Sequence, residues 1–446
     1  MLGSGSAGRG SKLLTSARGA NTAGALFGVS MKILYLSQSS GIPILGGKGA
    51  SVHIRELVAA FTRAGHSVAV ASSLLNKSPW ELPASLGVPV LHIPEKASEP
   101  ALLAVEAFNQ TVGTTNSLPK ELRYILHNQE VVAQLHQRLR SNPPDVIYER
   151  ASLFGIAGVL LARQLKVPLI LEINAPLTKE QEIYRRMSLT DLATAAESWA
   201  LTQADVVLAV SSQLRDHAIS LGADPGRVRV LPNGVNPGLF NPAIPAQHVR
   251  HRWGVHEGPI LGFVGGLRPW HDMKALPPLL HRLSQRYAKL QMVIVGEGPL
   301  RIALEDDLKR LGIRERVVLT GSVPHEDIPE LIRLFDVAVA PYAHLDHAFY
   351  FSPLKLFEYM ACGVPVVGAR LGQLVEVIRH GETGLLYDAG DIDGLASACD
   401  RLLNDDKLRQ RMGAMAAKDV LEHYTWDRNA ERVTELARLL RGTRPN

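Results

Sequence analysis

The sequence predicts an α/β protein with two parallel sheets, each covered by helices on both faces. Two observations carry this prediction. Short, uniformly apolar runs alternate with helix-like stretches from Met31 onward, and a dense turn signal at 232–238, Pro-Asn-Gly-Val-Asn-Pro-Gly, separates two such series. The length of 446 residues is too great for one ordinary core, and it suits two domains of roughly 200 residues each.

The composition excludes several other classes of protein. Hydrophobic residues make up 46% of the chain and charged residues 20%, as in soluble globular proteins. No apolar run approaches the ~20 residues that cross a bilayer. The net charge of +5 includes three basic residues before position 31, so the rest of the chain carries only +2. This charge is too small to indicate a nucleic-acid-binding protein. Two cysteines cannot form a disulfide framework, which indicates a reducing cytoplasm.

Residues 1–30 are rich in glycine, serine and alanine. They lack the apolar core of roughly 7–15 residues that a signal peptide needs. We expect a disordered extension, or a true start at Met31 rather than Met1, and a targeting role is the weaker interpretation.

The first domain is predicted over residues 31–240. A glycine-rich loop between Ser37 and Ser51 follows its first strand, and an amphipathic helix then runs to Gly65. Residues 77–140 contain six prolines and are predicted to hold an excursion with two helices. The strands are expected at residues 33–36, 67–71, 145–148, 168–173, 205–210 and 228–231.

The second domain is predicted over residues 241–425, after a linker around 232–257. Its strands are expected at residues 260–264, 291–295, 317–320, 337–340, 364–367 and 385–387. Residues 426–446 form an amphipathic helix that Thr425 is placed to cap. Because open α/β sheets bind ligands at the carboxyl ends of their strands, two such sheets predict a site in a cleft between the domains.

Residues 350–368 are the most informative stretch. Pro353 suits the first turn of a helix, and Gly363 is a C-cap before another strand. Ser352 and the free amides at this helix start would attract phosphate, with Lys355 close by. Glu358 lies one turn further along, where a carboxylate could accept both hydroxyls of a ribose. Phosphate at the helix start and ribose one turn behind it predict a nucleoside diphosphate site.

This stretch resembles the donor-site helix of the retaining glycosyltransferases of family 4. Other motifs of that family occur in order at the expected strand ends, and the resemblance covers residues 31–430. These motifs are Gly46-Gly47, Glu172-Ile173-Asn174-Ala175-Pro176, Pro232-Asn233-Gly234-Val235, Phe263 to His271, Val295-Gly296-Glu297-Gly298-Pro299 and Thr320-Gly321-Ser322-Val323. The resemblance implies the GT-B architecture, in which two Rossmann-like domains face a cleft and the last helix crosses back to the first domain.

The resemblance also implies a hexose-type sugar moving, with retention, from a nucleotide diphosphate sugar to a glycan or lipid-linked acceptor. This activity implies a role in polysaccharide or cell-envelope biosynthesis in the cytoplasm. Peripheral association with the inner face of the membrane is compatible with it. Carried over by position, the expected catalytic residues are Asn174, Arg268 and Lys355. The expected donor-binding residues are Gly46, Gly47, Gly265, Gly266, His271, Gly298, Ser322, Val323, Tyr350, Phe351, Ser352, Pro353, Leu354 and Glu358.

Two departures concern the diphosphate clamp. The family usually has an arginine and a lysine where this chain has Gly266 and His271. Arg268 is the candidate replacement, because a guanidinium binds phosphate through two parallel hydrogen bonds. A solvated loop arginine is the alternative.

Further departures concern the sugar. Tyr350 stands where the family has the first of two glutamates, so Tyr350, Phe351 or backbone amides must supply the sugar contact. Asn174 replaces a histidine and cannot shuttle a proton, so the leaving phosphate oxygen is the expected base.

Several residues are open to two interpretations. Glu172 and the pair Glu149-Arg150 are either structural ion pairs or ligand contacts. His53 faces the cleft by analogy with the family, or is a surface helix histidine. Lys48 suits a negatively charged acceptor, or is solvated.

No metal and no cofactor are expected. The one Asp-x-Asp pattern, at Asp391 to Asp393, lies at a late helix start rather than at a strand end. A nicotinamide dehydrogenase is excluded because Arg301 stands where the third glycine of its fingerprint should follow Gly298. A nucleotide-sugar epimerase of the same architecture and a non-catalytic sugar-nucleotide-binding protein stay open.

Overall fold

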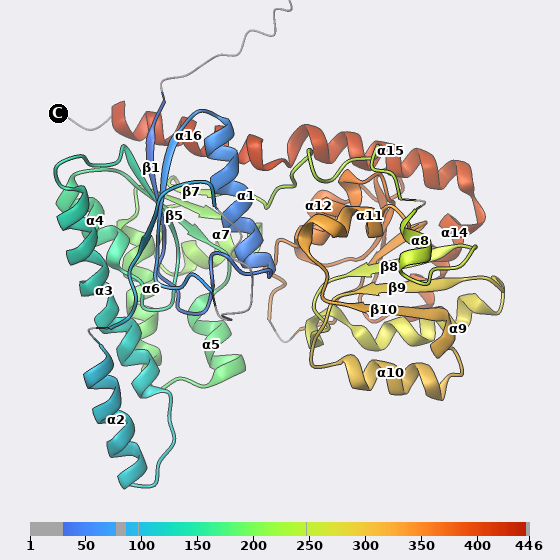
Figure 1. Ribbon diagram of the computed structural model, residues 1–446, viewed down its shortest axis with the longest axis horizontal. Helices are drawn as coiled ribbons and strands as arrows, with labels where there is room; N and C mark the ends of the chain where they lie inside the picture. Colours follow the sequence, from blue (N-terminus) through green and yellow to red (C-terminus); the bar gives the residue numbers. More distant parts are fainter. Residues whose placement is uncertain (1–29, 77–85, 97, 247, 346, 443–446) are drawn as a thin grey trace, which may run out of the picture. The chain divides into compact units, whose positions relative to one another are not determined.

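The structure is a computed structural model that describes residues 30–76, 86–96, 98–246, 248–345 and 347–442. Met31–Asn446 form one compact unit. The prediction for the N-terminal extension falls on residues outside the described ones. Two separate parallel sheets organise the compact unit (Figure 1). We call each sheet with its covering helices the first lobe and the second lobe.

The first lobe contains a seven-stranded parallel sheet in the order β3-β2-β1-β4-β5-β6-β7. The strands are β1 (Lys32–Ser37), β2 (Ser67–Ser72), β3 (Val90–His92), β4 (Val146–Arg150), β5 (Leu169–Ile173), β6 (Val206–Ala209) and β7 (Val228–Val230). Strand β3 was not predicted, since this short edge strand is largely exposed and lacks a continuous apolar pattern.

Helices cover both faces of this sheet. They are α1 (Gly49–Arg63), α2 (Glu99–Thr111), α3 (Leu118–Leu139), α4 (Ala157–Leu165), α5 (Leu177–Arg185), α6 (Thr190–Gln203) and α7 (Ser212–Ser220). Helices α3, α4, α6 and α7 pack on one face, and α1 packs on the other. Helices α2 and α3 are the predicted excursion, a hairpin that projects from the sheet (Figure 1).

The second lobe contains a six-stranded parallel sheet in the order β10-β9-β8-β11-β12-β13. The strands are β8 (Ile260–Val264), β9 (Gln291–Val295), β10 (Val317–Gly321), β11 (Val337–Ala340), β12 (Val366–Ala369) and β13 (Gly384–Tyr387). The helices are α8 (Val249–Arg252), α9 (Leu276–Ser284), α10 (Arg301–Arg310), α11 (Ile328–Ile332), α12 (Leu354–Ala361), α13 (Gly372–Val377), α14 (Ile392–Asn404) and α15 (Asp406–His423), with 3-10 turns η1 (Pro269–His271), η2 (Met273–Ala275), η3 (Arg314–Arg316) and η4 (His325–Asp327).

The prediction for β12 was wrong by two residues. Gly363 has φ +72° and ends α12 as predicted, but the amide of Val364 still bonds the carbonyl of Tyr359 in that helix. Val364 therefore completes the helix cap, and the strand begins only at Val366.

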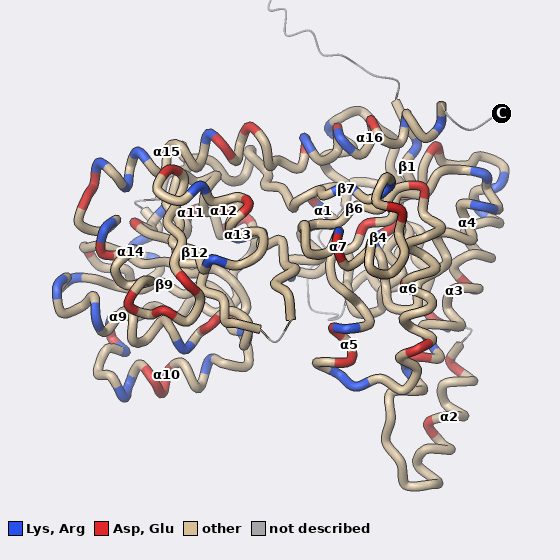
Figure 2. Tube along the Cα trace, turned by 180° about the vertical axis from the view of Figure 1, so that it is seen from behind, with Lys and Arg blue, Asp and Glu red and all other residues tan. Residues whose placement is uncertain are grey.

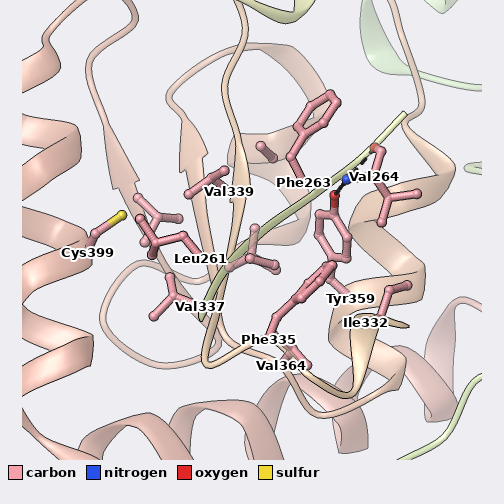
Figure 3. Packing of buried hydrophobic residues seen from close by; sticks show 14 of the residues in the cluster. Leu261, Phe263, Val264, Ile332, Phe335, Val337, Val339, Tyr359, Val364 and Cys399 are labelled. Carbon is pink, nitrogen blue, oxygen red and sulfur yellow. Dashed lines mark hydrogen bonds between the residues drawn. The ribbon is translucent and has the colours of Figure 1, made fainter. Parts of the chain in front are cut away.

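The core of the second lobe is apolar on both faces of its sheet. Figure 3 shows Tyr359 of α12 reaching across this core to β8, where its hydroxyl accepts a hydrogen bond of 2.6 Å from the amide of Val264. Cys362 and Cys399 are both buried. Charges of both signs lie on the outer helices, for example along α10 and α15 (Figure 2).

Helix α16 (Trp426–Gly442) begins after Thr425, whose hydroxyl caps it by accepting from the amide of Arg428 at 3.2 Å. Its apolar stripe, Trp426, Ala430, Val433 and Ala437, is buried in the same core cluster as α1 of the first lobe. The chain therefore returns to the first lobe after completing the second. Within the described residues, no helix is long and apolar enough to cross a membrane.

In each sheet the strand order reverses at one place, between β1 and β4 and between β8 and β11. Loops leaving the carboxyl ends of the two strands separate there and leave room for a ligand. These two places direct attention to the loops after β1, β4, β8 and β11.

Candidate active site

Two glycine loops of the second lobe lock together through their backbones. The amide of Gly265, after β8, donates to the carbonyl of Val295 at 2.8 Å, and the amide of Leu267 donates to the carbonyl of Glu297 at 3.1 Å. Gly265 and Gly296 have φ of +145° and +134°, which side chains rarely adopt. A Cβ at Gly296 would collide with the carbonyl oxygen of Gly265. The loops therefore expose bare backbone at the end of the sheet.

A buried lysine lies directly against this backbone. Lys355, on the first turn of α12, is 8% exposed, and a Cβ on Gly265 would stand only 2.6 Å from its Nζ. The ammonium lies 4.2 Å from the ring centroid of Phe263 and 5.5 Å from that of Tyr342. Burial lowers the pKa of Lys355 to about 7. The structure therefore brings Lys355 and the first glycine loop together.

His271 holds this lysine. Its Nδ1 lies 2.6 Å from the carbonyl oxygen of Gly266, and its Nε2 lies 3.1 Å from Nζ of Lys355. Because a carbonyl can only accept, Nδ1 carries the proton and Nε2 accepts from the lysine. Burial, reinforced by the charge of Lys355, lowers the pKa of His271 to about 2. The imidazole is therefore neutral and both of its nitrogens are engaged.

The start of α12 differs from the prediction in one detail. Pro353 occupies the N-cap position with ψ 115°, so it precedes the first helical residue, Leu354, rather than lying in the first turn. Ser352 accepts a hydrogen bond from the amide of Asn233 at 2.9 Å, and its carbonyl accepts from the side-chain amide of Asn233 at 2.6 Å. Leu354 packs against the core of the first lobe and lies near Gly49 at the start of α1. The turn after β7 thereby fixes where α12 begins.

Glu358, one turn further along α12, is 7% exposed. Its Oε1 lies 3.1 Å from Nε2 of His325, in η4. Burial disfavours the charged imidazole, but the hydrogen bond and charge of Glu358 outweigh it and raise the pKa of His325. One carboxylate oxygen is thus fixed by His325. No motif in the sequence identified His325 as this partner.

Arg268 lies at the mouth of the same loops. It is half-buried, and its guanidinium carbon lies 6.0 Å from the ring centroid of Trp270. A Cβ at Gly266 would contact the Arg268 stem at 3.5 Å. Arg268 is therefore beside Gly266, and its guanidinium has no ion-pair partner among the described residues.

Three other residues that were predicted to bind the donor lie in or beside these loops. A Cβ at Gly298 would approach the carbonyl oxygen of Leu267 to 2.5 Å. Ser322 and Val323 follow β10 directly, with Ser322 exposed and Val323 packed partly against the core. The amide of Gly296 donates to the carbonyl of Gly321 at 2.9 Å. The end of β10 is thus bonded to the second glycine loop.

A cavity of about 590 Å³ lies at the carboxyl ends of the first sheet. Asn174 lines it from the first lobe, and Tyr350 and Phe351 line it from the second. The structure therefore brings together the three residues assigned to the sugar, although they are far apart in sequence. The lining comprises residues 38–42, Glu95, Lys120, Arg123, Tyr124, His127, residues 150–153, Gly155, Asn174, Ala175, Leu177, Glu180, Gln181, Arg185, Tyr350 and Phe351.

Tyr350 is tied to the first lobe at both ends. Its hydroxyl donates to Oε2 of Glu180 at 2.9 Å, and its carbonyl accepts from the hydroxyl of Ser211 at 2.8 Å. Phe351 stacks on Trp270 with ring centroids 6.1 Å apart. Glu180 and Trp270 were not recognised from the sequence, because nothing in their local pattern separates them from ordinary helix and loop residues.

Gly46 and Gly47 do not line this cavity. The carbonyl of Gly46 accepts from the guanidinium of Arg55, while Gly47 is exposed with open space around it. Their loop instead precedes α1, whose first residue, Gly49, faces Leu354. Lys48 beside them is exposed.

The remaining polar residues at the strand ends form a buried cluster. Nε2 of His53 lies 2.8 Å from Oε1 of Glu172, and Nη1 of Arg150 lies 3.6 Å from Oε2 of Glu172. Burial alone would raise the pKa of Glu172, but His53 and Arg150 lower it overall. His53 is therefore buried rather than a surface residue, and its Nε2 is engaged by Glu172. Burial raises the pKa of Glu149 to about 8, so this carboxyl is mostly protonated at neutral pH.

Metal ligands do not gather here. Across the described parts of the chain, no group of three or more His, Cys, Asp or Glu side chains is arranged to hold a metal ion. Asp391 instead caps α14, where its carboxylate accepts from the amide of Gly394.

Two family models match this chain. The family model described as "Glycosyl transferase 4-like domain" matches residues 48–234, and the model described as "Glycosyl transferases group 1" matches residues 258–405. A GDP-mannose-dependent alpha-(1-6)-phosphatidylinositol monomannoside mannosyltransferase of Mycolicibacterium smegmatis is 31% identical over 52% of this chain and 62% of its own length. The chain thus spans less than two thirds of that relative.

Two further comparisons extend over most of the chain. A D-inositol 3-phosphate glycosyltransferase of Pseudarthrobacter chlorophenolicus is 28% identical over 86% of this chain and 88% of its own length. The structure of Anabaena HepE in complex with UDP and glucose covers 91% of this chain and 99% of its own, with a TM-score of 0.69 and 20% identity. At that identity the likeness to HepE is one of fold.

Proposed function

Because this chain belongs to the group 1 glycosyltransferases of family 4 type and has their GT-B architecture, we propose that it is a retaining hexosyltransferase. It takes the sugar from a nucleotide diphosphate sugar and passes it to a hydroxyl of a glycan or lipid-linked acceptor. The relatives support a hexose donor, since one is named for GDP-mannose and HepE binds UDP and glucose.

The observation that carries this proposal is Lys355 beneath the Gly265 loop. A buried ammonium with a lowered pKa is costly alone, but a diphosphate at the glycine loops would provide its missing counter-charge. Backbone amides and Arg268 would share the remaining charge, and His271 would hold the lysine in place. These groups would stabilise the departing diphosphate without a metal ion.

The other residues position the reactants. Glu358, oriented by His325, would accept the ribose hydroxyls through its carboxylate. Asn174, Tyr350 and Phe351 lie where the donor sugar would meet the acceptor, in the cavity at the end of the first sheet. Asn174 can hydrogen-bond a sugar hydroxyl but cannot take a proton, so an oxygen of the leaving phosphate would accept the proton of the acceptor.

The test begins with thermal stabilisation by UDP-, GDP- and ADP-sugars, because a ligand of the native state raises the unfolding midpoint. The stabilising donor is then incubated with a panel of acceptors, and the anomeric configuration of the product is read by NMR. We expect transfer with retention. Donor epimerisation without an acceptor would indicate an epimerase instead, and binding without any turnover would indicate a non-catalytic protein.

A further inference from the structure

The cavity at the end of the first sheet is elongated. It is lined by Glu95, just after the edge strand β3, and by Asn174, just after β5. Four strand intervals separate β3 from β5 in the sheet order, and at ~4.8 Å each they span about 19 Å. The second lobe contributes Tyr350 and Phe351 to the lining. Most of the cavity is therefore available to the molecule that receives the sugar.

Positive charge is in excess along this lining. The lining contains four basic side chains and only two acidic ones, namely Lys120, Arg123, Arg150 and Arg185 against Glu95 and Glu180. Both acids are already engaged, because Glu95 pairs with Arg123 at 3.1 Å and Glu180 accepts the hydroxyl of Tyr350. Among the described residues, no ion pair joins Lys120 or Arg185 to an acid.

Arg150 makes this excess a built feature. The residue is only 8% exposed, yet it lines the cavity. Its Nη1 is fully enclosed and faces Glu172, whose Oε2 lies 3.6 Å away and whose other oxygen pairs with His53. The part of Arg150 that lines the cavity would place a positive charge against a bound anion.

Helix α3, which carries Lys120 and Arg123, is held in place by hydrogen bonds of buried side chains. Glu121, between Lys120 and Arg123, is buried and accepts from the amides of Ser188 and Leu189 at 2.9 and 2.8 Å. Two turns further along α3, Asn128 bonds the carbonyl of Phe154 and the amide of Ile156 in the loop after β4. The N-terminal half of α3 is thus fixed to both neighbouring loops.

The donor's diphosphate does not account for these cations. The glycine loops at Gly265 and Gly296, and Lys355 beneath them, are all absent from the lining of this cavity. We infer that the acceptor carries a phosphate group, held by Arg150, Arg123 and Lys120, while a hydroxyl of the same molecule lies near Asn174. This inference rests on the proposed function and specifies its acceptor.

The test measures inorganic phosphate binding by calorimetry, with the donor site saturated by the nucleoside diphosphate found in the donor panel. The variants are Lys120→Gln, Arg123→Gln and the double variant. Arg138→Gln is the control, since Arg138 is exposed on the same helix and, within the described part of the chain, bonds only Gln134. We expect the dissociation constant for phosphate to rise about tenfold in the double variant, and to stay within about twofold of wild type in the control.

A second arm compares myo-inositol 3-phosphate with myo-inositol, and glucose 6-phosphate with glucose, as acceptors or as competitive ligands. Phosphatidylinositol vesicles test a lipid source of the same group. A preference for the phosphorylated member of each pair supports the inference if the double variant loses it and the control keeps it. The vesicle experiment distinguishes a soluble phosphate ester from a lipid phosphate as its source. The inference is overturned if the protein binds nucleotide normally but does not bind phosphate, or if the double variant binds phosphate as tightly as wild type. Failure to bind any nucleotide sugar would instead contradict the proposed function.

Discussion

The Nζ atom of Lys355 lies 3.1 Å from Nε2 of His271, and the other imidazole nitrogen is bonded to the carbonyl of Gly266. The resemblance to family 4 places a cation at position 271, but this chain has a neutral imidazole there. The histidine instead accepts from a lysine on α12. Lys355 on the helix thus supplies the positive charge that the loop lacks at position 271.

This arrangement predicts a pH dependence of donor binding. The pKa of Lys355 is about 7 in the free protein, and a bound diphosphate would raise it by favouring the ammonium. Binding is then strongest below pH 7, and above it the dissociation constant of the nucleotide sugar should rise about tenfold per pH unit. Calorimetry between pH 6 and 9 measures this slope.

Lys355→Met is the matched variant, because it keeps the length of the stem and removes the charge. We expect weak binding with a flat pH profile. His325→Gln controls for the other titrating group near α12, and it should keep the slope. A wild-type profile that is flat from pH 6 to 9 would contradict the role given to Lys355.

The second prediction concerns Glu358. If its carboxylate holds the ribose, Glu358→Gln should weaken binding of the free nucleoside diphosphate by about 1.5–3 kcal/mol, as for a charged hydrogen bond. The amide is nearly isosteric, so the thermal midpoint without ligand should change little. Calorimetry with the nucleoside diphosphate gives the affinity, and an unchanged value in a folded variant would refute the assignment.

The third prediction concerns metal ions. The charge of the diphosphate should be neutralised by Lys355, Arg268 and the amides at the start of α12, so transfer should persist in excess EDTA. Initial rates are compared before and after chelation, with magnesium or manganese added back. Activity that disappears with EDTA and returns with either ion would overturn the metal-free mechanism.

The fourth prediction concerns α16. Its apolar stripe is buried with α1 in the first lobe, the rings of Trp426 and His53 make an edge contact with centroids 4.8 Å apart, and Asp427 pairs with Arg63 at 2.7 Å. Deleting residues 426–446 should uncover apolar surface and loosen the alignment of donor with acceptor. Turnover should fall far more than nucleotide affinity, because the donor residues lie in the second lobe.

Trp426→Ala is a milder version of this test, and removing so large a buried side chain should cost about 3–5 kcal/mol of stability. Arg441→Gln, near the exposed end of the same helix, is the control. A truncated protein that is soluble and turns over at the full rate would show that α16 does not align the lobes.

The fold could be predicted from the sequence because its strands are short apolar runs that alternate with helices. The strands over 260–264, 291–295 and 337–340 have the predicted bounds. The edge strand β3 could not be found, since two of its three residues are exposed. Val364 was assigned to a strand because it is apolar, but its amide completes the cap of α12.

The site was harder to predict, because its partners are set by tertiary contacts. The pattern around Pro353 located α12, and Lys355 and Glu358 on it. Nothing local in the sequence indicates that His271 and His325 bond these two side chains, since each lies on a different loop. The basic residues of α3 were missed for a similar reason, because 77–140 gave only a general expectation of two helices.

The contact between Gly265 and Gly296 constrains how this site can change. With no room for even a methyl group between them, the two loops form a single mechanical piece, and neither can shift to admit a different donor unless the other moves as well. New donor preferences would therefore have to come from side chains that border the two glycine loops, such as Arg268 and Ser322, while the backbone of the loops stays unchanged.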